Sequence, residues 1–254
     1  MTVLLAGRRD GTTHREVALL ASLPPELRLI GGLAVMCRVG TPHRTTVDID
    51  AVARDLTRFH DTLARLALTA GGGGQYRFEG DLDLDVIDVA PLRTGELIDQ
   101  LRVPGLPLSD LELNVIAHTW AHDTATPLDI AAVDDERGDI LARASGRLVA
   151  TGAGLVAMKA TTVPLRASSK PDKRASELYD LGRLLVTGGA TGAVLGAMPP
   201  DLLEPVRDRL RGWFLDPGGR DRTYRDVRRF DEPRLDLDEV ADAVAEMVPK
   251  AIDP

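Results

Sequence analysis

The feature of this sequence that most constrains its fold is a change, near residue 150, in the spacing of its apolar residues. Before this point, short β-branched runs alternate with stretches whose apolar residues recur every three or four positions. Alternation with period two is typical of strands, and a spacing of three to four is typical of amphipathic helices. After this point the helical spacing dominates. We therefore predict an α/β (α+β) domain over residues 1–150 and a C-terminal helical bundle over residues 151–254.

A strand, a tight turn and a buried helix are predicted in this order over residues 27–37. Residues 27–30 form an apolar run that stops at Gly31 and Gly32, and a second apolar run follows. Adjacent glycines mark a tight turn because they adopt backbone conformations that other residues avoid. A helix that begins at such a turn presents N–H groups that suit an anion such as a triphosphate.

A half-buried strand is predicted over residues 46–52, where apolar and polar positions alternate. The alternation places Asp48 and Asp50 together on the face opposite the apolar residues. Two carboxylates at this spacing have Cα atoms about 6.6–7 Å apart, so their oxygens can converge on a hard cation. Without a cation, like charges about 4 Å apart repel by roughly 4 kcal/mol at an effective dielectric of 20. Outward acids on half-buried strands are common, but the upstream glycine pair favours a metal site here.

A second acid-rich strand is predicted at residues 82–86, where leucine and valine alternate with aspartate. Asp85 is the predicted third carboxylate, because its apolar neighbours repeat the pattern around Asp48. Asp83 and Asp88 remain alternatives for this role.

Other segments are assigned by the same patterns. An amphipathic helix is predicted over residues 56–66, before four glycines at residues 71–74 that are interpreted as a flexible connection. The apolar runs at residues 113–116 and 128–132 are candidates to extend the sheet. Helices in the second domain, bounded by proline and glycine, are predicted at residues 155–161, 174–186, 202–213 and 240–248.

Composition excludes several classes of protein. Cys37 is the only cysteine, so an intrachain disulfide and a thiolate-rich zinc site are excluded. The formal charge of −8 argues against nonspecific coating of nucleic acid, and DNA is not expected as a partner. An arginine-rich stretch over residues 207–229 is interpreted as a solvated helix face and loop. Without a long apolar run or a secretory signal, we expect a cytoplasmic protein with no membrane partner.

Two histidines have the spacing of a zinc site. His118 and His122 lie four positions apart, which on a helix would let both rings bind one ion. The glutamate of the metalloprotease motif is missing between them, and residues 115–116 resemble a strand. We interpret both histidines as surface or structural residues.

Four stretches carry motifs in a fixed order: residues 29–34 (LIGGLA), 44–50 (RTTVDID), 155–160 (LVAMKA) and 174–181 (RASELYDL). Together they resemble the nucleotidyltransferase superfamily and, more narrowly, the AbiEii-type (MenT-like) nucleotidyltransferase toxins of bacterial toxin–antitoxin systems. Two positions depart from the family pattern. Leu33 stands where the family usually has serine, and Glu177 stands where it usually has aspartate.

The resemblance implies a nucleotidyltransferase-like mixed sheet with flanking helices and an Mg²⁺-dependent enzyme. Such an enzyme transfers a nucleoside monophosphate from a nucleoside triphosphate to an acceptor hydroxyl and releases pyrophosphate. Two Mg²⁺ ions, or Mn²⁺ in their place, would be held by Asp48, Asp50 and Asp85. Lys159 would act as a point charge on the triphosphate, and Asp180 would orient that lysine or take up a proton. The implied nucleotide-binding residues are Gly31, Gly32, Arg44, Thr46 and Lys159.

The acceptor that the resemblance implies is the 3′ end of tRNA or another RNA, with a cognate antitoxin protein as a further partner. Two alternatives stay open. A small-molecule nucleotidyltransferase of the antibiotic-modifying kind shares the glycine pair and the paired aspartates, and it suits the net negative charge. A catalytically silent nucleotide-binding module is suggested by Leu33, since the usual hydroxyl is missing.

Overall fold

The computed structural model describes residues 2–40, 48–166, 170–230 and 234–247. The chain forms two compact units, and each unit is made of two segments. The first consists of Met1–Pro91 and His122–Thr151, and the second of Leu92–Ala121 and Gly152–Pro254. The first unit therefore ends next to the expected boundary at residue 150. The segment Leu92–Ala121, which the sequence pattern grouped with the sheet, belongs to the helical unit.

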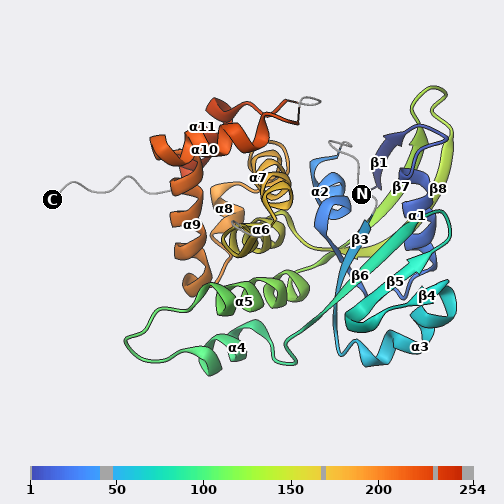
Figure 1. The fold of residues 1–254 in the computed structure, drawn as a ribbon, viewed down its shortest axis with the longest axis horizontal. Coiled ribbons are helices and arrows are strands. Elements are labelled where there is room, and N and C mark those ends of the chain that lie inside the picture. The colour runs from blue at the N-terminus through green and yellow to red at the C-terminus, as the bar shows by residue number, and fades with distance from the viewer. Residues whose placement is uncertain (1, 41–47, 167–169, 231–233, 248–254) are drawn as a thin grey trace. The chain divides into compact units, whose positions relative to one another are not determined.

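The described residues of the first unit contain an eight-stranded sheet in the order β1-β7-β8-β2-β3-β6-β5-β4 (Figure 1). The strands are β1 (Thr2–Gly7), β2 (Arg28–Ile30), β3 (Asp48–Arg54), β4 (Thr69–Ala70), β5 (Gln75–Phe78), β6 (Leu82–Val89), β7 (Thr126–Asp134) and β8 (Ile140–Val149). The pairs β1–β7, β8–β2 and β3–β6 are parallel, and the other neighbours are antiparallel. The sheet is thus mixed, and the predicted α/β class is confirmed.

Helices of the first unit pack on this sheet. They are α1 (Thr13–Ser22), α2 (Gly31–Val39) and α3 (Thr57–Leu66). α1 packs on β7 and β8, while α2 contacts β1, β2 and β3. The predicted order of strand, glycine turn and buried helix is confirmed by β2 and α2, whose residues from Gly32 to Cys37 are buried.

The glycine run lies in the hairpin between β4 and β5. Its residues Gly72–Gly74 form a short 3₁₀ turn, η1. The Gly71 N–H donates to the carbonyl of Gln75 at 2.7 Å, which closes the turn. Gly74 has a φ of +87°, and a Cβ there would overlap the Val86 carbonyl of β6. The connection is therefore a defined turn that packs against the neighbouring strand.

The second unit is helical in its described residues, as the spacing of apolar residues predicts. Its helices are α4 (Thr94–Leu101), α5 (Asp110–Asp123), α6 (Gly152–Arg166), α7 (Pro171–Val186), α8 (Gly192–Leu195), α9 (Pro200–Phe214), α10 (Pro217–Val227) and α11 (Leu237–Met247). Helix α5 belongs to this unit up to Ala121, and its last two residues belong to the first unit. Proline occupies the first turn of α7, α9 and α10, where its missing N–H costs no hydrogen bond. None of the helices in the described part of the chain combines the length and hydropathy that a membrane crossing requires.

One predicted strand is a helix. Residues 113–116 were expected to extend the sheet, but they lie within α5, so this prediction was wrong. Leu113, Ile116 and Trp120 are buried at spacings of three and four, which is the stripe of a helix. Short apolar runs do not separate the two structures by periodicity alone. The other candidate, residues 128–132, lies in β7 as predicted.

Candidate active site

Four aspartates stand side by side on β3 and β6. The parallel pairing places Asp48 opposite Asp83 and Asp50 opposite Asp85. All four are partly exposed, whereas the residues between them on each strand are buried. In-register side chains project from the same face, with strands about 4.8 Å apart and successive same-face residues about 6.6–7 Å apart. The strand register therefore gathers four carboxylates in one small area.

The three candidates for the third carboxylate differ in their positions on β6. Asp83 forms an ion pair with Arg77 of β5, with 3.2 Å between Nε and Oδ1. Asp88 accepts a hydrogen bond of 3.1 Å from the backbone N–H of the N-cap residue of α3. Asp85 is in register with Asp50. Because Asp50 lies against the start of α2, this register favours Asp85 as the third carboxylate of the site.

The backbone of Gly31 packs directly against Asp50. β2 pairs antiparallel with β3, so that Ile30 stands opposite Asp50 and Gly31 comes next. Gly31 has a φ of +68°, in the left-handed region that other residues rarely adopt. A Cβ at this position would overlap the Asp50 carboxylate. Glycine is therefore required both for the backbone conformation and for the close approach.

The N-terminus of α2 begins at this contact. Its N-cap residue, Ile30, has no side chain that could accept a hydrogen bond from the first N–H groups. Leu33, which replaces the serine of the family pattern, is fully buried in the core. Donors for an anion here are therefore the backbone N–H groups of the first turn, which the helix dipole also makes favourable for negative charge.

A cavity of about 390 Å³ opens beside the carboxylates, on the side of β5 and β4. It is lined by Asp48, Thr69, Gly71, Gln75, Tyr76, Arg77, Asp83 and Asp85. Three carboxylates outnumber one guanidinium, so the wall attracts cations. The volume is in the range of small-molecule sites.

The donor set suits a hard cation that arrives with a phosphate ligand. Among the described residues, no group of three or more His, Cys, Asp or Glu side chains is arranged to hold a metal ion by itself. Mg²⁺ in nucleotide-dependent enzymes usually takes one or two protein carboxylates and completes its shell with phosphate oxygens and water. Asp48 and Asp50 supply such a pair, with Asp85 on the adjoining strand. These residues therefore fit Mg²⁺ or Mn²⁺.

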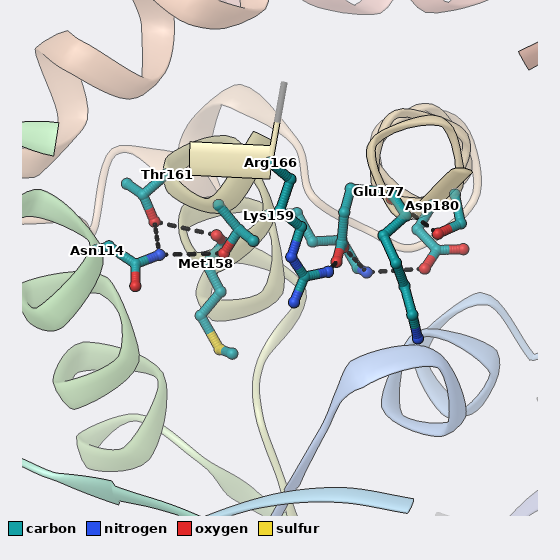
Figure 2. A network of polar contacts seen from close by, with 10 residues as sticks. Asn114, Met158, Lys159, Thr161, Arg166, Glu177 and Asp180 are labelled. Carbon is teal, nitrogen blue, oxygen red and sulfur yellow. Dashed lines mark hydrogen bonds and ion pairs between the residues drawn. The ribbon is translucent and has the colours of Figure 1, made fainter. Parts of the chain in front are cut away.

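In the second unit, Lys159 lies in a buried network of ion pairs between α6 and α7 (Figure 2). Its Nζ donates to Glu177 Oε2 at 2.6 Å and to Asp180 Oδ2 at 2.7 Å. Lys159 is 5% exposed and Asp180 is fully buried. Arg166 also pairs with Glu177. The hydrogen bond from Lys159 to Asp180 is the contact that an orienting carboxylate requires.

Sequence reasoning missed Glu177 as a partner of this lysine. Glu177 and Asp180 are three positions apart on α7, a spacing that puts two side chains on one helix face. That spacing is a signal that would have identified the pair. Arg44 and Thr46, predicted to bind the nucleotide, lie outside the described residues.

The two histidines have local partners. The strand interpretation used against a zinc site was wrong, because both lie on α5. Nδ1 of His118 lies 2.7 Å from the carbonyl of Asn114, and Nδ1 of His122 lies 3.3 Å from Asp123 Oδ1. Burial lowers the pKa of both rings, that of His122 to about 4. Neutral rings with local partners suit structural histidines.

The first unit thus combines a cluster of carboxylates with the N-terminus of a helix. It brings together Gly31, Gly32, Asp48, Asp50 and Asp85, and the second unit brings together Lys159 and Asp180. Comparisons of the chain with models of protein families, with curated proteins and with solved structures found no significant match.

Proposed function

We propose that this protein is an Mg²⁺-dependent nucleotidyltransferase, which transfers a nucleoside monophosphate from a nucleoside triphosphate to an acceptor hydroxyl. One observation carries the proposal. The strand register sets Asp48 and Asp50 beside Asp85, and the N-terminus of α2 starts against Asp50. A cation site next to an anion site is what a metal-bound triphosphate needs.

The residues of the first unit have separate roles in this reaction. Asp48 and Asp50 would hold the metal ions, with Asp85 as the third carboxylate. Bound Mg²⁺ neutralises phosphate charge and lowers the pKa of the acceptor hydroxyl. The backbone N–H groups at Gly31 and Gly32 bind the triphosphate. The motif resemblance adds Lys159, with Asp180, as a charge for the triphosphate.

The proposed acceptor is the 3′ end of tRNA, as for a toxin whose partner is an antitoxin protein. Support for this acceptor is the resemblance of the four motifs. A second candidate is a small cationic alcohol of the antibiotic type. It is favoured by the net charge of −8 and by the three carboxylates of the cavity.

The proposal is tested by labelling tRNA with the wild type and with Asp48→Asn, Asp50→Asn and Asp88→Asn. Each protein is incubated with Mg²⁺, labelled nucleotides and total tRNA, and RNA is separated on a denaturing gel. We expect the first two variants to lose at least about 100-fold in rate, since several kcal/mol of charge stabilisation is removed. Asp88→Asn is the matched control, because its amide oxygen can still accept the hydrogen bond from the N-cap of α3.

Three outcomes would count against parts of this proposal. Equal labelling by Asp48→Asn would show that the chemistry lies elsewhere. Label on an aminoglycoside-like alcohol and none on RNA would select the second candidate. A folded wild type that labels neither acceptor with any nucleotide, yet binds a nonhydrolysable triphosphate by calorimetry, would be a silent module.

A further inference from the structure

The sheet continues past Asp85 into β5 and β4, and the register aligns its side chains in two rows. The first row, from β3 outward, is Asp48, Asp83, Arg77 and Thr69, and the second is Asp50, Asp85 and Gln75. On the opposite side of Asp50, the neighbour is Ile30, at the start of α2. The α2 N-terminus and the β5–β4 hairpin therefore flank the carboxylates from opposite sides.

This order assigns the two substrates to opposite sides, given the proposed function. In phosphoryl transfer the attacking and leaving oxygens lie roughly in line with the phosphorus atom. If the triphosphate lies at the N-terminus of α2, its pyrophosphate leaves on that side. The attacking hydroxyl then approaches from the side of β5. The cavity of about 390 Å³ opens on that side.

Arg77 is the one cationic side chain among the described residues that line this cavity. Its Nε donates to Asp83 at 3.2 Å, and its side chain is 58% exposed. A guanidinium has five N–H donors, and the described part of the chain gives its terminal nitrogens no partner. The ion pair with Asp83 thus orients the Nε edge of the guanidinium, while its two terminal nitrogens can form a bidentate contact with a phosphate.

We propose that this cavity is the acceptor subsite and that Arg77 binds a phosphate of the acceptor next to the attacked hydroxyl. Gln75, in register with Asp85, offers an amide donor and acceptor to the terminal nucleoside. The acceptor is then the phosphate-bearing end of an RNA. A small cationic alcohol has no phosphate for Arg77 to bind. The inference rests on the proposed function.

A merely structural role for Arg77 makes a different prediction. An exposed ion pair between neighbouring strands contributes little to stability, and by itself it would not change the affinity for an acceptor. Thermal unfolding of Arg77→Gln should therefore stay close to that of the wild type in either case. Only acceptor affinity separates the two roles.

The test compares Arg77→Gln and Arg77→Lys with Arg65→Gln, which removes the same charge from an exposed position on α3. Two quantities are measured: the KM values for tRNA and for the nucleotide, and the Kd for a fluorescein-labelled single-stranded RNA dodecamer by anisotropy without nucleotide. We expect Arg77→Gln to raise the KM for tRNA and the Kd about tenfold, as for loss of a charged hydrogen bond. The KM for the nucleotide should change less than about twofold. Arg77→Lys should recover part of the loss, and Arg65→Gln should match the wild type.

The two proposals fail in different ways. If the wild type labels tRNA and Arg77→Gln matches Arg65→Gln in both measurements, the acceptor subsite is wrong and the transferase stands. If the wild type transfers to no acceptor, the proposed function fails. In that case weaker dodecamer binding by Arg77→Gln still supports an RNA site, and absence of dodecamer binding by the wild type overturns it.

Discussion

At Gly31, a φ of +68° and the lack of a Cβ let the first residue of α2 touch the Asp50 carboxylate. We expect Gly31→Ala to displace this carboxylate and to abolish metal binding and transfer. The matched control is Gly40→Ala, at a φ of +81°, where no atom of the described residues lies within 4 Å of a Cβ built at this position. Both variants carry the cost of a left-handed alanine, about 1 kcal/mol or more.

The measurement is Mn²⁺ binding by electron paramagnetic resonance, together with urea denaturation. Gly31→Ala should be the less stable variant and the only one to lose Mn²⁺. Equal Mn²⁺ binding by the two alanine variants would show that contact with Gly31 does not position Asp50.

His122 makes stability depend on pH. Its side chain is 5% exposed, its Nε2 meets no hydrogen-bond partner among the described residues, and burial lowers its pKa to about 4. In the unfolded chain the ring has an ordinary pKa near 6.5, so between these values only the unfolded state takes up the proton. The effect of His122 on the free energy of unfolding is therefore as follows: stability is fully present above pH 6.5, and it is lost as the pH falls toward 4. The loss is at most about 1.4 kcal/mol per pH unit.

The pH dependence attributed to His122 is checked by urea denaturation. The wild type and His122→Gln are compared at several pH values between 7 and 4.5. Carboxylates contribute to both proteins, so the quantity of interest is the difference between the two pH dependences. The wild type should lose more stability than the variant as the pH falls. Identical pH dependences would contradict a neutral buried ring.

At the scale of the elements, the packing of α6 against α7 depends on buried ion pairs of Lys159. Asp180→Ala would remove a carboxylate that pairs with the buried ammonium of Lys159, and removing one partner of a buried pair typically costs about 3–5 kcal/mol. The matched control is Asp172→Ala on the same helix, whose side chain is 88% exposed and pairs with Arg229. We expect a change below about 1 kcal/mol there. Equal losses in chemical denaturation would show that the buried network is not a main source of stability.

Two of the elements that the sequence missed, α10 and α5, lack a clear local signal. α10 is rich in arginine and glycine, and only Gly219, Thr223 and Val227 are buried, so it has no apolar stripe. In α5 the leucines and valine at 111, 113 and 115 alternate like a strand. Their helix is identified only when residues up to Trp120 are counted, because a helical stripe needs two or more turns to show.

At the scale of the whole molecule, the second unit is assembled from two distant segments. Asp110 of α5 pairs with Arg209 of α9, and Asn114 donates to Thr161 and Thr162 of α6. We expect residues 152–254 alone to melt at lower temperature than a chain in which residues 92–121 are joined to them by a glycine–serine linker. Circular dichroism melting compares the two chains. Equal midpoints would show that α4 and α5 are dispensable for this unit.

By itself, the sequence determined the strand that carries Asp48 and Asp50, the glycine turn before α2 and four of the eight described helices of the second unit. Each follows from spacing within about ten residues, so local periodicity suffices. Only the tertiary structure decided that Asp85 is the carboxylate beside Asp50. The register of β3 against β6 joins segments more than thirty residues apart, and it depends on how both strands bury their apolar faces. The same holds for the residues 92–121, whose own pattern does not specify which core they complete.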